Sequence, residues 1–130
     1  MTVALLKIVL SVGLGLVIGL ERETSGKSVG IRTLSLICLG STLFCLMSPT
    51  ILGGDNSRVV AQIVSGIGFL GAGIIFKNGD EVHGLTTAAT IWATAAIGAL
   101  VGMGLYTESI VGSIAILVIN MLFKYFKNLK

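Results

Sequence analysis

The chain has 130 residues, of which 54% are hydrophobic and only 12% are charged, and its formal net charge is +3. Water-soluble domains carry about 25% charged residues, so this composition excludes an ordinary soluble globular domain. We expect an all-α integral membrane protein, a single domain over residues 1–130 in which about five transmembrane helices pack through glycines and other small residues. The positive charge bears on membrane topology and gives no reason to expect nucleic-acid binding.

Apolar stretches recur along the chain, each close to the length of about 20 residues that a helix needs to cross a bilayer. They cover residues 3–20, 31–48, 59–76, 86–101 and 105–123. In the first stretch, Gly15 and Gly19 form a G-x-x-x-G pattern, which predicts close contact with a neighbouring helix. The single charge of that stretch, Lys7, is expected to reach the nearer membrane surface.

Charged residues lie at the ends of these stretches. Glu21 and Arg22 directly follow the first, and Arg32 stands at the start of the second. Charges at or below the membrane surface tend to pair or to line water. We therefore predict an ion pair between Glu21 and Arg32 that joins the first two helices.

Arg58 stands at the start of the third stretch, and Gln62 follows one helical turn later. Two arrangements are consistent with these positions. Arg58 pairs with Asp55 at the membrane surface, or it points inward beside Gln62.

The third stretch is rich in glycine and reads I-V-S-G-I-G-F-L-G-A-G-I-I-F over residues 63–76. Its G-x-G-x-x-G spacing would suggest dinucleotide binding only after a strand and before a polar helix start, and neither is present. Helices in lipid associate by close approach across small residues, so we interpret this side as a packing surface. Its members are Ser65, Gly66, Gly68, Gly71 and Gly73. The alternative is a helix opened at residues 71–73, with carbonyls that face an ion.

Threonines recur at helical spacing in the fourth stretch, at Thr86, Thr90 and Thr94. Such hydroxyls usually bond the carbonyl four residues earlier in the helix, and this is the arrangement we expect. The alternative is a hydroxyl stripe that lines a narrow polar path against the third stretch. In the fifth stretch, Asn120 is expected to bond a neighbouring helix.

No catalytic set of nucleophile, base and orienting group is visible, so we do not expect an enzyme. Residues 77–84 are expected to form a tight surface turn. Asp80, Glu81 and His83 within that turn are a weak set of ligands for a divalent cation. We assign no cofactor and no metal ligands; Mg²⁺ or another cation is the ligand to consider.

Basic residues predict the orientation of the chain in the membrane. Five spans place seven of them on one side: Arg22, Lys27, Arg32, Lys77, Lys124, Lys127 and Lys130. Only Lys7 and Arg58 fall on the other side. Because basic loops stay in the cytoplasm, we expect the N-terminus outside and the C-terminus in the cytoplasm.

Four segments resemble, in order, the transmembrane domain of the MgtC/SapB family. They are I-G-L-E-R-E at 18–23, G-I-R-T at 30–33, R-V-V-A-Q-I-V-S-G-I-G-F-L-G-A-G at 58–73 and G-L-T-T-A-A-T-I-W at 84–92. The resemblance implies a multi-pass protein of the bacterial inner membrane, in a family linked to growth at low Mg²⁺ and to survival inside host cells. Longer members continue into a cytoplasmic C-terminal domain, and the expectation here is a short member without one.

Two functions are compatible with these observations. The first is a regulatory protein in adaptation to low Mg²⁺ or related ion stress, acting through a membrane partner such as the F-type ATP synthase. The second is a transporter or channel for an ion or small cation. The bilayer and a second copy of the chain, as a homodimer, are the other expected partners. The functional polar cluster is expected to comprise Glu21, Arg22, Arg32, Thr33, Asp55, Arg58, Gln62, Thr86, Thr87, Thr90 and Trp92.

Overall fold

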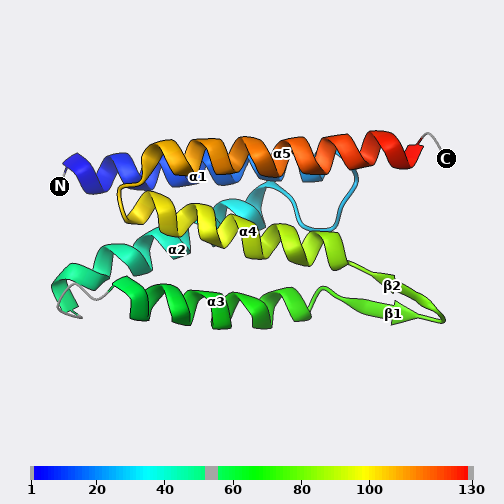
Figure 1. The fold of residues 1–130 in the computed structure, drawn as a ribbon, viewed down its shortest axis with the longest axis horizontal. Coiled ribbons are helices and arrows are strands. Elements are labelled where there is room, and N and C mark those ends of the chain that lie inside the picture. Colours follow the sequence, from blue (N-terminus) through cyan, green and yellow to red (C-terminus); the bar gives the residue numbers. More distant parts are fainter. Residues whose placement is uncertain (1, 52–55, 129–130) are drawn as a thin grey trace.

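The computed structural model describes residues 2–51 and 56–128. Over this part of the chain it forms five helices and one antiparallel hairpin (Figure 1). The elements are α1 (Thr2–Thr24), α2 (Ile31–Ile51), α3 (Asn56–Ala72), β1 (Phe76–Asn78), β2 (Glu81–His83), α4 (Leu85–Gly102) and α5 (Tyr106–Asn128). The all-α fold predicted from composition is confirmed.

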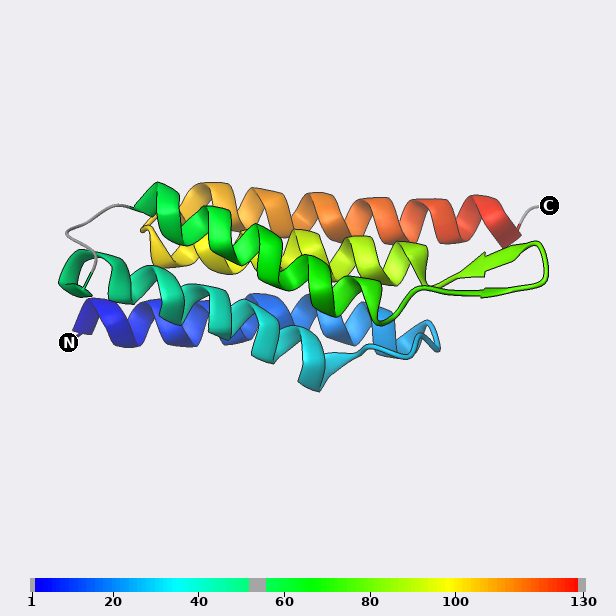
Figure 2. The ribbon, with the colours of Figure 1, turned by 90° about the horizontal axis from the view of Figure 1, so that it is seen from below.

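Three helices of the described chain are long and apolar enough to cross a membrane: α1, α4 and the Tyr106–Phe126 segment of α5. The protein is therefore a multi-pass membrane protein. α2 contributes a shorter apolar segment, Ile31–Met47, and α3 has 17 residues. All five helices run along the long axis of the bundle (Figures 1 and 2). Crossing of the membrane by all five remains a prediction.

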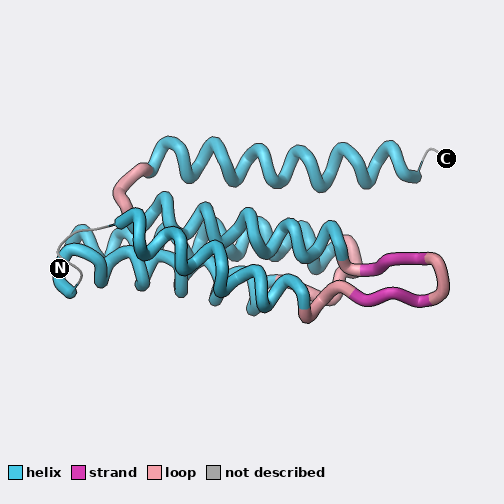
Figure 3. The backbone as a smooth tube through the Cα atoms, turned by 60° about the horizontal axis from the view of Figure 1, so that its bottom comes forward, coloured by secondary structure: helices cyan, strands magenta, loops and turns pink. Residues whose placement is uncertain are grey.

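α4 is the central helix of the bundle. It contacts each of the other four described helices, and eleven of its 18 residues are buried. α3 packs on α2 and α4, whereas α5 packs on α1 and α4, so α3 and α5 lie on different sides of the bundle (Figure 3). The many alanine, threonine and glycine residues of α4 allow this crowding, because small side chains let helix backbones approach closely.

The glycine pair of α1 packs against α2, as the sequence predicts. A Cβ atom added at Gly15 would lie 2.8 Å from the carbonyl oxygen of Leu34. One added at Gly19 would lie 2.6 Å from Cα of Ile31. Both separations are shorter than real Cβ contacts, so these two positions require glycine.

A second glycine pair, which the sequence reading missed, holds α4 against α2 further along that helix. A Cβ atom at Gly98 would collide with the carbonyl oxygen of Cys38, and one at Gly102 would lie 2.5 Å from Cβ of Cys45. The same end of α4 also accepts a hydrogen bond of 2.8 Å from Lys7 Nζ to the Gly102 carbonyl oxygen. The Lys7 side chain, which was predicted to reach the membrane surface, thus extends to the C-terminus of α4. The backbone dipole favours a cation there.

The third apolar stretch is shorter than predicted. Its helix ends at Ala72, not at residue 76, and Phe76 begins a strand that pairs with His83. The turn expected over residues 77–84 is thus part of a hairpin. Its two loop residues are Gly79 and Asp80, and glycine with a positive φ of 66° at the first of them is typical of a tight turn between two paired strands.

Within the described chain, only part of the predicted packing surface on α3 contacts another helix. Gly71 faces Ala88, whose Cβ would lie 3.6 Å from an added Cβ. Gly66 and Gly68 are exposed, and an added Cβ at either would meet nothing within 4 Å. Ser65 and Gly73 are exposed as well. The physical reason is that α3 packs its bulky stripe of Val59, Ile63 and Ile67 into the core clusters instead.

Candidate functional site

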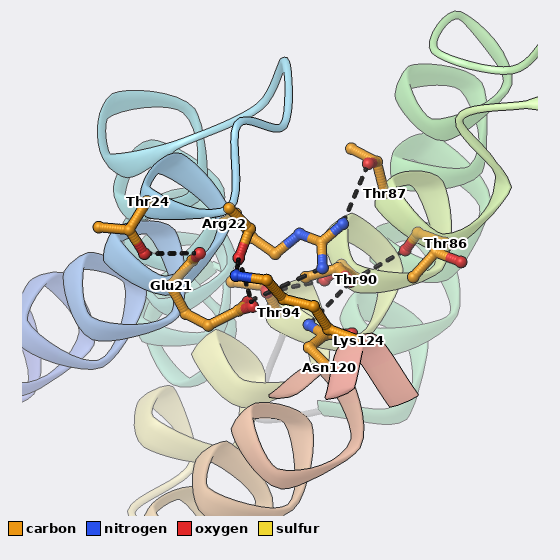
Figure 4. Close-up of polar contacts among 10 residues, drawn as sticks. Glu21, Arg22, Thr24, Thr86, Thr87, Thr90, Thr94, Asn120 and Lys124 are labelled. Atoms are coloured by element: carbon orange, nitrogen blue, oxygen red, sulfur yellow. Dashed lines mark hydrogen bonds and ion pairs between the residues drawn. The ribbon is translucent and has the colours of Figure 1, made fainter. Parts of the chain in front are cut away.

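A buried arginine occupies the end of the bundle where α1 and α5 end and α4 begins (Figure 4). Arg22 is only 3% exposed. Its Nη2 donates a hydrogen bond of 3.4 Å to Thr87 Oγ1, and its Nη1 lies 3.7 Å from Glu21 Oε2. Because a guanidinium stays charged under all ordinary conditions, a positive charge is fixed between α1 and α4.

The carboxylate of Glu21 extends this site to the loop after α1 and to α5. Its Oε1 accepts a hydrogen bond of 3.1 Å from Ser25 Oγ. Ser25 Oγ in turn accepts one of 3.0 Å from Lys124 Nζ. We call Glu21, Arg22, Ser25, Thr87 and Lys124 the arginine network. It connects α1, the α1–α2 loop, α4 and α5 at one end of the bundle.

Two buried polar atoms of the arginine network have no hydrogen-bond partner among the described residues. They are Nε of Arg22 and Oε2 of Glu21, the latter held only by the 3.7 Å ion pair. Buried polar groups are nearly always hydrogen-bonded, and a charged group that is not so bonded costs several kcal/mol, on the order of 3. The arginine network can therefore accept a further polar group, or it loses stability readily when one member is removed.

Threonines beside the arginine network bond within their own helix, as predicted. Thr90 Oγ1 donates to the Thr86 carbonyl at 2.9 Å, and Thr94 Oγ1 donates to the Thr90 carbonyl at 2.7 Å. Asn120 Nδ2 of α5 donates to Thr90 Oγ1 at 3.3 Å, which confirms the predicted bond to a neighbouring helix. These hydroxyls are thus engaged in hydrogen bonds within α4, and Thr90 also joins α4 to α5.

The predicted ion pair between Glu21 and Arg32 is wrong. Glu21 pairs with its neighbour Arg22, and no bond joins it to Arg32 within the described ranges. Arg32 and Thr33 are exposed at the start of α2. The reason is geometric: the first turn of α2 buries Leu34 and turns Arg32 and Thr33 outward.

The other predicted site residues lie away from the arginine network. Arg58 and Gln62 line a groove of about 960 Å³ between α2 and α3. Trp92 is 56% exposed and lines a smaller groove of about 270 Å³ between α3 and α4. Asp55 lies outside the described residues. The predicted cluster is therefore divided among the arginine network, the α2–α3 groove, the α3–α4 groove and the exposed start of α2.

Sequence reading missed Ser25 and Lys124 as members of the arginine network. Ser25 stands in a short polar segment that resembles a solvated loop, and Lys124 follows the last apolar stretch. Only the approach of α5 to the α1–α2 loop joins them. In the hairpin, His83 stacks on Phe76 with ring centroids 5.0 Å apart and lies 3.4 Å from Glu81. Within residues 2–51 and 56–128, no three His, Cys, Asp or Glu side chains come together as metal ligands would.

Comparison with known proteins gives one family. The model of the MgtC family matches residues 8–129. Protein MgtC of Brucella abortus (strain 2308) is 49% identical over 113 residues, which are 85% of this chain and 47% of that protein. Protein MgtC of Salmonella typhimurium (strain LT2) is 45% identical over 111 residues, 85% of this chain and 48% of that protein. An uncharacterized Synechocystis protein is 44% identical over 120 residues, 91% of this chain and 51% of its own. The chain spans about half the length of these relatives, and no solved structure matches.

Proposed function

The chain belongs to the MgtC family, and on that basis we propose that it is a regulatory membrane protein in adaptation to low Mg²⁺ that acts through a membrane partner. The observation that carries the proposal is an exposed row of small residues along α3. Ala61, Ser65, Gly68 and Ala72 are all exposed, and we call them the small-residue face. In lipid, helices associate through such faces because their backbones can approach closely.

Two partners fit the small-residue face in this proposal. One is a second copy of the chain, since a two-fold dimer is the commonest way for a protein to cover a surface of its own. The other is a helix of a larger membrane complex, for which the family resemblance supplies the F-type ATP synthase as the candidate. Neither partner requires the chain to transport an ion.

Replacing Gly68 by leucine should weaken self-association by about tenfold, because the side chain would separate backbones that now approach closely. The fold of the single chain should persist, since an added Cβ there meets nothing within 4 Å. Subunit exchange between labelled copies in liposomes measures the effect. Gly13→Leu is the matched control, an exposed glycine of α1 with equally open surroundings. Equal exchange constants for both variants and the wild type would show that this face is turned to lipid.

A transporter or channel for a small cation is the second candidate function. It is favoured by the two buried atoms of Glu21 and Arg22 that have no hydrogen-bond partner in the described chain, since incomplete polar sites are typical of transport paths. The Thr90 and Thr94 hydroxyls of α4 disfavour a transport path, because they are already hydrogen-bonded within the bundle. Flux of Mg²⁺ into liposomes that hold only this protein separates the two functions, since only the transporter requires it.

We also propose that the N-terminus lies outside and the C-terminus in the cytoplasm of the bacterial inner membrane. Ser28→Cys, in the exposed α1–α2 loop, should then react with a membrane-impermeant thiol reagent only from the cytoplasmic side. Ser57→Cys, in the first turn of α3, should react only from the outside. Cys38 and Cys45 are buried and should contribute little background. Labelling of both positions from one side would contradict the five-span topology.

A further inference from the structure

The groove between α2 and α3 shares Ala61 with the small-residue face but is otherwise lined by different residues. Its volume of about 960 Å³ lies at the upper end of the range of about 300–1,000 Å³ for small-molecule sites. Most of its wall is apolar, with Phe44 and Met47 from α2 and Ile67 and Leu70 from α3. The groove is therefore suited to an apolar chain and not to a hydrated ion.

Arg58, the charged residue of the groove lining, lies at one end, and the other polar lining residues are Gln62 of α3 and Ser41 of α2. Arg58 is the third residue of α3, and Gln62 lies one turn further along the helix, about 6 Å deeper. The backbone dipole at the start of α3 adds positive potential to that of Arg58. Arg58 also takes part in an interaction within the chain. A guanidinium has five N–H donors, so it can hold a phosphate as well.

We propose that the α2–α3 groove binds an anionic phospholipid. Arg58 holds the phosphate, because guanidinium and phosphate form paired, charge-assisted hydrogen bonds. Gln62 donates to an ester carbonyl just below the phosphate. One acyl chain follows the apolar wall towards Leu70.

The dimensions support this occupant. From Arg58 to Leu70 the helix rises about 18 Å, close to the roughly 15 Å of hydrocarbon in one leaflet. Gln62 is exposed at a depth where water is scarce, so its amide requires a hydrogen-bonding partner that an acyl chain alone does not offer. A two-fold copy is a poorer fit, because an axis normal to the membrane would bring two Arg58 side chains together at one depth.

Glycine substitutions separate this groove from the small-residue face. Gly66 lines the groove, and an added Cβ there meets nothing within 4 Å. Gly66→Leu should fill the path of the acyl chain without disturbing the helix contacts of the single chain. Gly68→Leu adds the same side chain two residues further along α3, outside the groove lining, and is its matched control.

Native mass spectrometry of the full chain, released from nanodiscs of equal phosphatidylglycerol and phosphatidylcholine, tests the proposal. The wild type should retain phosphatidylglycerol about tenfold over phosphatidylcholine, as one charge-assisted contact allows. Gly66→Leu and Arg58→Gln should lose this retention. Gly68→Leu and Arg32→Gln, an exposed arginine outside the groove, should keep it.

Several results would overturn the proposal. Equal retention of the two lipids, or equal loss in Gly66→Leu and Gly68→Leu, would show that no anionic lipid occupies the groove. If soluble glycerol phosphate displaces phosphatidylglycerol, the site binds only the anionic group and the groove does not hold an acyl chain. A groove covered by a second copy would give dimers without lipid that Gly66→Leu dissociates. If Arg58→Gln fails to fold, the comparison of Gly66→Leu with Gly68→Leu still tests whether lipid occupies the groove. Loss of dimers in Gly68→Leu with lipid still bound would leave this proposal intact and affect only the proposed assembly.

Discussion

Replacing Gly98 by alanine is expected to destabilise the bundle by about 3 kcal/mol, the upper part of the usual range for overfilling a packed core. The added Cβ would collide with the carbonyl oxygen of Cys38 and lie 2.8 Å from Cβ of Ser41. Neither neighbour can rotate away, because one is backbone and the other is the first side-chain atom. The two helices would have to separate, and with them the contact that places α4 at the centre of the bundle.

The measurement is the midpoint of unfolding of the purified protein in mixed micelles with increasing denaturing detergent. Gly13→Ala is the control, since Gly13 is an exposed helical glycine with nothing within 4 Å of an added Cβ. Alanine there should stabilise the helix slightly, by about 0.5–1 kcal/mol, because it has the higher helix propensity. If Gly98→Ala unfolds at the same midpoint as the wild type, the close contact between α2 and α4 does not exist.

Replacing Arg22 by glutamine is the second change for which we expect a large effect, a loss of about 3 kcal/mol. It leaves the buried carboxylate of Glu21 without its ion-pair partner, and it removes the hydrogen bond to Thr87. Breaking one side of a buried pair usually costs about 3–5 kcal/mol, and we expect the lower end because Glu21 keeps its bond to Ser25. The same micelle unfolding experiment measures it.

The double variant Glu21→Gln with Arg22→Gln should recover much of the stability, because no charge is then left unpaired. Arg32→Gln, at an exposed position, should change stability by less than about 0.5 kcal/mol. Growth of a host strain at low Mg²⁺ distinguishes a structural role from a functional one. Stability that recovers without growth would indicate that one of the two charges acts on a partner or substrate. Full stability of Arg22→Gln alone would show that the arginine network is a solvated rim.

The composition of the chain predicted the all-α membrane fold, and the apolar stretches placed most of the helices correctly. These features depend on local properties, namely hydropathy and helical length, which any arrangement of the helices would share. The same holds for the hydrogen bonds of Thr90 and Thr94, whose acceptors are four residues away in the same helix. The Gly15 and Gly19 contact was also predictable because the spacing marks one face of one helix.

The partner of a side chain depended instead on how the helices are arranged. Glu21 could in principle reach Arg22 or Arg32, and the choice follows from the rotation of α2, which buries Leu34 and exposes Arg32. Ser25 and Lys124 are 99 residues apart and meet only because α5 returns to the α1–α2 loop. No local pattern could indicate that contact.

By itself, the sequence determined that this chain is a helical membrane bundle and that α1 has a glycine face. It also determined that threonine hydroxyls of α4 donate to carbonyls of the same helix. Tertiary structure alone decided which glycines are buried: Gly98 is pressed against α2, whereas Gly66 and Gly68 face outward. Both sets of glycines look alike in sequence. In lipid, a buried helix face and a lipid-facing one are both apolar, so composition does not tell them apart. The two sets differ in the space that the neighbouring helices leave beside each glycine. On α3, the side chains of Val59, Ile63 and Ile67 fill the space in the bundle, so Gly66 and Gly68 face outward.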